Sequence, residues 1–182
     1  GAIGPEANLM GADLRNFDLR NINLTGADLR RVCLRGVQLQ GALLRDMKWE
    51  GAYYDESTQF PEGFDEELSG TYFIGPKVNL RGADLSKSNL RGADLSGADL
   101  RDVNLCGANL KEADLRHVEL RSVSLRKANL SNANLSGAIV EADLWKAKLI
   151  GASLCNANFS KSDLRKANLW RADLSNADLS EA

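Results

Sequence analysis

An apolar residue, nearly always leucine, recurs at every fifth position along most of this chain. The central position of each five-residue unit, here called i, recurs through residues 9–54, 80–140 and 144–179. Leucine fills 27 of these 31 positions, and the exceptions are the apolar residues Trp49, Tyr54, Val140 and Phe159. A helix turns by about 100° per residue, so a spacing of five would scatter the leucines around its surface. The spacing therefore argues against helices in these segments.

The other positions of the unit predict a short strand and a corner. Position i−2 is small and apolar in most units, with Ser88 and Ser162 as its only polar members. Since one polar residue separates i−2 from i, both side chains lie on the same buried face of a strand. Eleven glycines and several asparagines occupy i+2, and both residue types tolerate the positive φ of a tight turn. The expected core is represented by Leu29, Leu85, Leu95, Leu115 and Phe159.

Corners at a fixed interval wind a chain into a solenoid whose coils pair like parallel strands. The periodicity alone leaves the number of sides open. The motif A-(D/N)-L-x-x, as in GADLR at 26–30, GADLS at 92–96 and KANLS at 127–131, resembles the pentapeptide-repeat family. The resemblance implies an all-β fold, a right-handed quadrilateral parallel β-helix of about eight coils with four repeats each. By association with the family, we also expect a cyanobacterial source.

We expect a single domain over residues 1–182, with repeat blocks at 7–55 and 78–182 and a non-repeat loop at 56–77. A register slip is expected near 138–144, because only four residues lead from Val140 to the next centre. Either Ile139 or Val140 must then be the inward centre, and a bulge or a widened turn should result. Both a tolerated deletion and a functional kink are open interpretations of the slip.

The non-repeat loop differs in composition from the repeats. Residues 55–77 carry a net charge of −5, which leaves +3 on the repeats. The aromatic side chains of the loop should anchor it on the repeats, and Pro61 can start a short helical turn that runs to Leu68. We interpret the loop as an accessory surface whose removal leaves the β-helix folded. Its acidic residues are Glu56, Glu62, Asp65, Glu66 and Glu67.

Overall composition excludes several classes of protein. The net charge is −2, and no apolar run approaches the 18 residues of a membrane span. The three cysteines fit neither a disulfide framework nor a zinc site, and the amino terminus does not resemble a secretory signal. We expect a cytoplasmic protein with no membrane association and no cofactor or metal. The only histidine, His117, lies at an outward corner without a nucleophilic partner, so the sequence does not predict an enzyme.

Outward charges alternate in sign. Position i−1 is rich in Asp and i+1 in Arg, so a column such as Arg81, Arg101 and Arg121 should lie beside acids. A charge-paired, solvated face is the main interpretation, and a track that binds anions is the alternative.

Three apolar residues, Trp145, Ile150 and Trp170, occupy i+1, where Arg or Ser is usual. Exposed aromatic side chains often mark contact sites, so we predict an interaction surface here; isolated tolerated apolar residues are the alternative. The open apolar ends of a solenoid could also support a homodimer.

The function that follows is a rigid, non-catalytic protein-interaction scaffold with an unknown protein partner. The resemblance implies one alternative, because some family members mimic duplex DNA and bind DNA gyrase or related topoisomerases. Such mimicry needs a strongly acidic rod, whereas the repeats of this chain carry a net charge of +3. Direct binding of nucleic acid is not expected.

Overall fold

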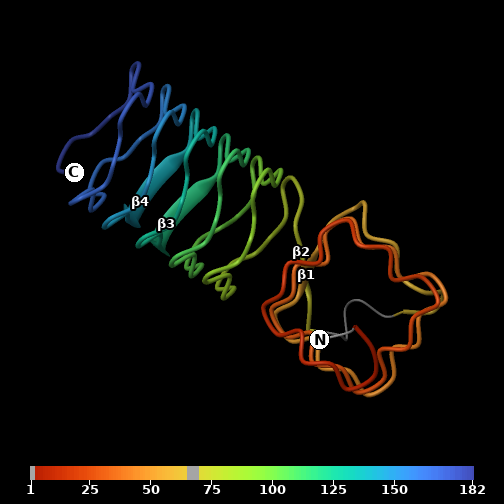
Figure 1. The fold of residues 1–182 in the computed structure, drawn as a ribbon. Coiled ribbons are helices and arrows are strands. Elements are labelled where there is room, and N and C mark those ends of the chain that lie inside the picture. The colour runs from red at the N-terminus through yellow and green to blue at the C-terminus, as the bar shows by residue number, and fades with distance from the viewer. Residues whose placement is uncertain (1–2, 65–69) are drawn as a thin grey trace. The chain divides into compact units, whose positions relative to one another are not determined.

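The computed structural model describes residues 3–64 and 70–182. It contains two compact units, Gly1–Ile74 and Gly75–Ala182. In each unit the chain winds into coils that stack on one another (Figure 1). The described residues include no helix that is long and apolar enough to cross a membrane. Both units are thus built from one element, a coil of short parallel strands.

Parallel bridges connect residues 20 positions apart, such as Asn8 with Asp28, and Asn79 with Asp99. Four five-residue units therefore complete one coil, and residues 20 apart stack on the same side. Most bridges are isolated because each unit turns after about three residues. Longer strands are β1 (Tyr53–Tyr54), which pairs in parallel with β2 (Tyr72–Phe73), and β3 (Glu119–Ser124), which pairs in parallel with β4 (Ile139–Asp143).

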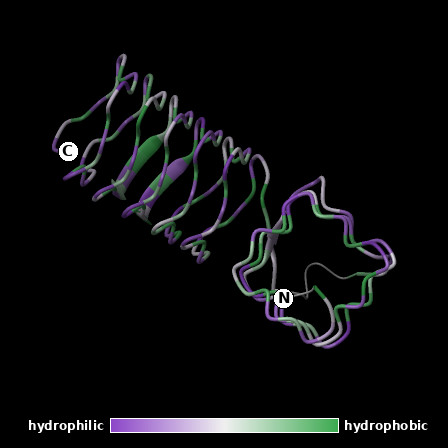
Figure 2. Ribbon diagram, in the orientation of Figure 1, coloured by the Kyte–Doolittle hydropathy of each residue, from purple (hydrophilic) through white to green (hydrophobic). Residues whose placement is uncertain are grey.

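The core consists of the centres at i and the small residues at i−2. Leu29, Leu95 and Phe159 have no exposed surface, and Leu85 and Leu115 are 2% and 1% exposed. Figure 2 shows the resulting alternation of polar and apolar residues along the coils. Burying one leucine side chain contributes about 1.5–3 kcal/mol, so the repeated core is the main source of stability.

The corner at i+2 has a left-handed backbone whichever residue occupies it. The φ angle is 69° at Gly137, and it is 58° at both Asn132 and Lys146. A Cβ atom at Gly137 would lie 2.6 Å from Nδ1 of His117 in the preceding coil, so this corner admits only glycine. Elsewhere the corner accepts long polar side chains, which extend into solvent.

Residues 56–77 do not leave the coils as the loop that we predicted. The backbone N–H of Gln59 donates to the Val37 carbonyl at 2.9 Å, and the Gln59 carbonyl accepts from Leu39 at 2.7 Å. Further along, Tyr72 of β2 pairs with Tyr53 of β1. The described parts of the segment therefore complete a coil of the first unit. One inserted residue before Gln59 breaks the spacing of five and hides this coil from a search for the repeat.

The insertion is held by two polar side chains. Thr58, which is 8% exposed, donates from Oγ1 to the Leu34 carbonyl at 2.8 Å. The Asp55 carboxylate accepts from Nε of Arg35 at 2.9 Å and from the backbone N–H of Gly36 at 3.2 Å. These bonds satisfy backbone groups of the coil beside an irregular turn.

Aromatic rings cover the end of the first unit's core. Phe60 and Phe64 stack with their centroids 4.2 Å apart, and Trp49 lies 5.3 Å from Phe64. Both phenylalanines pack against the buried leucines of this unit. The amide of Phe64 donates to the Pro61 carbonyl at 3.3 Å in a turn. The predicted helical turn extends to residue 68, and residues 65–69 lie outside the described part of the chain.

The register slip in the second unit takes the form of a bulge. Val140 is fully buried and is the inward centre, whereas Ile139 is half-buried. Arg121 pairs with Glu141 and Val123 pairs with Ala142, so the residue between Arg121 and Val123 is extra in β3. What β4 lacks is the corner residue at i+2, and the strand therefore continues from Ile139 to Asp143 without a turn.

The buried hydroxyl of Ser162 compensates for the missing corner. In a regular unit the amide at i−2 donates to the carbonyl three residues earlier, as Ala147 does to Leu144 at 2.8 Å. Ala142 lies only two residues after Val140, so this bond cannot form. Instead, Oγ of Ser162 donates to the Val140 carbonyl and accepts from the Ala142 amide at 3.4 Å. The polar exception at i−2 thus has a structural cause.

Candidate protein-interaction surface

Many of the outward acids are paired with an arginine of the same unit. Nη2 of Arg101 lies 2.5 Å from Oδ2 of Asp99, and the Arg101 amide donates to the same carboxylate at 3.2 Å. The hydrogen bond from the Arg101 side chain lowers the pKa of Asp99 to about 2. The same arrangement recurs at Asp13–Arg15, Asp18–Arg20, Asp28–Arg30, Asp114–Arg116 and Asp163–Arg165.

The arginine column that begins at Arg81 is also charge-paired. Arg121 contacts Glu119 at 2.7 Å and Glu141, one coil further, at 2.8 Å. Arg81 contacts Asp102 at 3.0 Å. The side chains of this column are neutralised by acids of the same or the next coil, which favours the solvated, charge-paired interpretation over an anion track.

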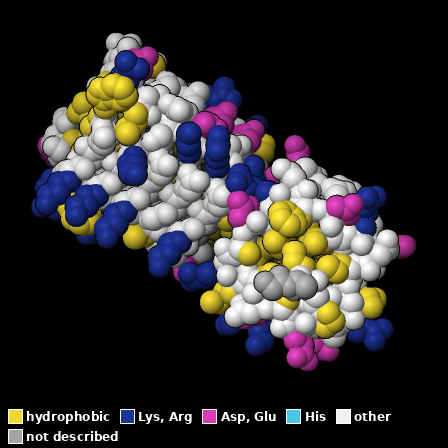
Figure 3. Space-filling model, viewed as in Figure 1, with side chains coloured by type: hydrophobic (Ala, Val, Ile, Leu, Met, Phe, Trp, Pro, Cys, Tyr) yellow, Lys and Arg dark blue, Asp and Glu magenta, His cyan; other side chains and the backbone are white. Residues whose placement is uncertain are grey.

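One face of the second unit lacks this balance. Segments 125–132, 144–151 and 164–171 lie in successive coils, because Asn129 bridges Lys148 and Lys148 bridges Asn168. All three segments are described, and none of them contains an acidic residue. We call these segments the basic-aromatic face. Figure 3 shows rows of Lys and Arg side chains on the visible side of this unit. The cations of the face are Arg126, Lys127, Lys146, Lys148, Arg165, Lys166 and Arg171.

Only two of these cations are neutralised within the described residues. Arg126 contacts Asp143 at 2.9 Å and Arg165 contacts Asp163 at 2.7 Å, both at the edge of the face. The other five form no ion pair with any described residue. The face therefore keeps a local positive charge although the whole chain is slightly acidic.

Trp145 lies among four cations. Nζ of Lys146 is 4.1 Å from the ring centroid, and Cζ of Arg126 is 4.6 Å from it. The Nζ atoms of Lys127 and Lys166 lie at 5.7 and 5.9 Å. A cation–π contact at an exposed site is worth about 0.5–1 kcal/mol. Since the half-buried ring attracts all four side chains, it concentrates positive charge at this corner.

Ile150 and Trp170 occupy the same position in successive coils. The amide of Gly151 donates to the Trp170 carbonyl at 2.9 Å, which fixes this stacking. Trp170 is 61% exposed, and Cζ of Arg171 lies 4.3 Å from its ring centroid. Trp145 precedes Ile150 by one unit and so lies on the adjacent side of the coil. The structure thus brings two of the three predicted residues together and places Trp145 across the corner.

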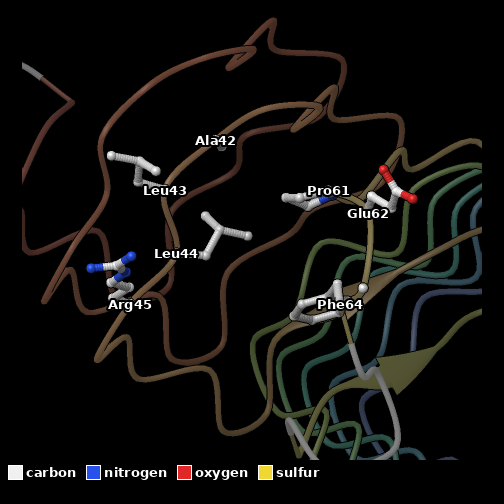
Figure 4. Close-up of a pocket in the computed structure, with 8 residues that line it drawn as sticks. Ala42, Leu43, Leu44, Arg45, Pro61, Glu62 and Phe64 are labelled. Carbon is white, nitrogen blue, oxygen red and sulfur yellow. The ribbon is translucent and has the colours of Figure 1, made fainter.

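The predicted acidic surface belongs to the first unit. Glu56 and Glu62 are exposed, whereas Asp65, Glu66 and Glu67 lie outside the described residues. Beside Glu62 is an open pocket of about 380 Å³, in which Leu44, Pro61 and Phe64 provide apolar surface (Figure 4). The complete lining is Ala42, Leu43, Leu44, Arg45, Pro61, Glu62, Gly63 and Phe64.

Sequence reasoning missed the lysine corner. It treated the outward charges as locally balanced, because acids and bases are nearly equal in number over the whole chain. A comparison of LRKANL at 125–130, LWKAKL at 144–149 and LRKANL at 164–169 could have revealed the missing acids. The missing residue at the slip obscured the alignment, because it makes the first two segments 19 residues apart instead of 20.

No described group of three or more His, Cys, Asp or Glu side chains is arranged to hold a metal ion. His117 is exposed at its corner, and its imidazole lies against Gly137 of the next coil. The histidine is therefore accounted for by packing at the corner.

Stacked coils with parallel bridges and an interior of centres and small residues define a β-helical repeat protein. The family model for pentapeptide repeats matches residues 7–46, 67–105, 98–137 and 139–169, with eight copies. The chain therefore belongs to the pentapeptide-repeat family, whose members fold as right-handed quadrilateral β-helices and are generally structural or interaction proteins.

Solved structures of pentapeptide-repeat proteins are similar to this chain. HetL, involved in heterocyst differentiation regulation in the cyanobacterium Nostoc sp. strain PCC 7120, is 28% identical; the match covers 94% of this chain and 89% of HetL, with a TM-score of 0.38. Rfr23 from the cyanobacterium Cyanothece 51142 is 25% identical over 57% of this chain and 89% of Rfr23, with a TM-score of 0.38. Full-length QnrB1, a plasmid-mediated fluoroquinolone resistance protein, is 19% identical over 97% of this chain and 85% of QnrB1, with a TM-score of 0.38. A search of curated protein sequences gave no match.

Proposed function

We propose that this protein is a rigid, non-catalytic interaction scaffold and that the basic-aromatic face is its recognition surface for another protein. The observation that carries this proposal is the 61% exposure of Trp170 on a face with seven cations and no acid. Trp and Arg are enriched in protein interfaces and among the residues that dominate binding energy. The side chains project from paired coils, so little ordering of the surface is needed on binding.

Affinity capture from an extract of the source organism tests this proposal. We expect a discrete partner to bind the unmodified protein and to be lost with Trp170→Ser combined with Trp145→Ser. Phe17→Ser is the matched control, because Phe17 is also exposed, at 47%, but belongs to the first unit. If the double variant captures the same proteins as the control, the proposed recognition surface is wrong.

The alternative function, a DNA mimic that binds DNA gyrase or a related topoisomerase, is less well supported. A mimic must present free negative charge, whereas Asp99, Asp114 and Asp163 are each bonded to an arginine. The unbalanced charge on the second unit is positive. We therefore place this activity second.

We also propose right-handed four-sided winding, about eight coils in all as the repeat count suggests, and a homodimer formed through a terminal coil. Supporting the dimer, Leu164, Leu169 and Leu174 are only half-buried and Leu179 is 39% exposed, unlike the equivalent centres of inner coils. Light scattering should give twice the chain mass, falling to a single chain with Leu179→Arg. A cytoplasmic location is part of the same proposal, supported only by the odd number of widely spaced cysteines.

A further inference from the structure

We infer that the basic-aromatic face recognises a short extended segment of its protein partner that carries both acidic and apolar side chains. This inference rests on the proposed function and specifies the chemistry of the segment that is bound. It follows from the different groups at the two borders of the face.

The lysine corner provides the binding site for acids. Lys127, Lys146 and Lys166 occupy the same corner in three successive coils, with φ of 59°, 58° and 61°. Coils are about 4.8 Å apart, so the outer two corners are separated by about 10 Å. All three lysines are exposed and lie within 5.9 Å of the Trp145 ring centroid. A carboxylate bound here would relieve the mutual repulsion of these ammonium groups.

The adjacent side of the coil provides the binding site for an apolar side chain. Ile150 and Trp170 form a continuous apolar strip at the far end of this side, next to the guanidinium group of Arg171. One side contains about three extended residues, so the strip lies about 10 Å from the lysine corner. A single extended peptide can therefore contact both groups, with side chains on one of its faces about 7 Å apart.

The dimensions favour a protein segment over a nucleic acid. Single-strand binding folds contact about 4–16 nucleotides, a longer track than three coils provide. Trp145 is surrounded by cations, which leaves Trp170 as the only open aromatic ring on the face. Asp143 and Asp163 at the edge would also repel a phosphate backbone that extended beyond the lysines.

The test measures fluorescence anisotropy of a labelled octapeptide, Glu-Glu-Leu-Leu repeated twice, bound to the full chain. Either face of this peptide, when extended, carries both Glu and Leu. The main variant is K127N/K146N/K166N, because Asn132 and Asn156 show that asparagine adopts the corner conformation, with φ of 58° and 55°. The matched control, R31N/K77N/K161N, removes equal charge from corners outside the face, where φ is 60°, 57° and 65°.

We expect the main variant to bind the peptide about tenfold more weakly and the control to change affinity by less than about twofold. Raising ionic strength from about 50 to about 300 mM should weaken binding to the unmodified protein. Trp170→Ser should weaken binding of the Glu-Leu peptide but not of a peptide with Ser in place of Leu. Circular dichroism of each variant verifies that it is folded.

Three outcomes would overturn the inference. They are equal losses in the two triple variants, equal binding of a peptide with Lys in place of Glu, and tighter binding of oligothymidylate that depends on the three lysines. Partner capture distinguishes the two levels of the account. If Trp170→Ser abolishes capture but the peptide shows no preference, the proposed function stands and only the acidic and apolar chemistry is wrong.

Discussion

The hydroxyl of Ser162 donates a hydrogen bond to the carbonyl of Val140 in the preceding coil, at the point where the spacing of five residues fails. The same oxygen accepts from the amide of Ala142, which has lost its regular partner. A side chain thus replaces one bond of the repeating backbone pattern. The slip is stable because a serine occurs one coil later at the matching i−2 position.

Replacing Ser162 with Ala should destabilise the protein by about 1–3 kcal/mol, because it leaves buried backbone groups without a partner. The control is Ser88→Ala. Ser88 occupies i−2 and is also buried, but among the described residues its hydroxyl has no hydrogen-bond partner. That change should be neutral or stabilising. Urea unfolding measures both, and equal effects of the two changes would contradict the role assigned to Ser162.

The pKa of Asp99, which the Arg101 side chain lowers to about 2, gives a prediction on pH. A carboxyl group with a lowered folded-state pKa stabilises the fold above its ordinary pKa of about 3.9. This contribution is lost as the pH falls through the interval from about 4 to about 2. Carboxyl-carbon NMR should therefore show Asp99 titrating near pH 2, and Arg101→Ser should raise its pKa toward the ordinary value. An unchanged titration in the variant would show that the pair does not persist in solution.

Phe60 should be structural and not part of an accessory loop. Its ring stacks on Phe64 and packs against the core of the first unit, so Phe60→Ala should destabilise that unit by about 1–3 kcal/mol. Phe17→Ala is the control; this exposed side chain should change stability by less than about 0.5 kcal/mol. Thermal unfolding followed by circular dichroism compares the two.

Deleting 56–77 should accordingly unfold part of the first unit, contrary to the expectation from sequence. The deletion removes the pairing of Gln59 with Gln38 and of β2 with β1. Hydrogen exchange at Leu39, whose amide donates to Gln59, should become faster in the deletion variant. Unchanged protection there would restore the interpretation as an accessory loop.

Periodicity predicted the stacked coils well because every centre meets the same environment, one coil after another. Leu95, for example, is buried for the same reason as Leu115 in the next coil. Non-local compensation could not be predicted in this way. Nothing near Gln59 indicates that it pairs with Gln38 across an insertion, and nothing near Ser162 indicates a missing corner at Ala142. The lysine corner also emerged only when the coils were aligned in space.

The charge pattern predicts that this protein does not inhibit DNA gyrase. The Asp99 and Asp163 carboxylates are ion-paired with arginines, so the second unit does not present the continuous negative charge of a DNA mimic. A supercoiling assay with micromolar protein should show full gyrase activity. Inhibition would favour the alternative function, especially if it survived K127N/K146N/K166N.

Site-specific photo-crosslinking from position 170 tests the central claim most directly. A photoreactive residue replaces Trp170 in one sample and Ser180 in another. Ser180 is also exposed but lies two units further along the chain, on the opposite side of a four-unit coil. We predict that position 170 crosslinks one discrete protein in an extract of the source organism and that position 180 does not. The same crosslinked species from both positions, or none from position 170, would contradict a recognition surface on the basic-aromatic face.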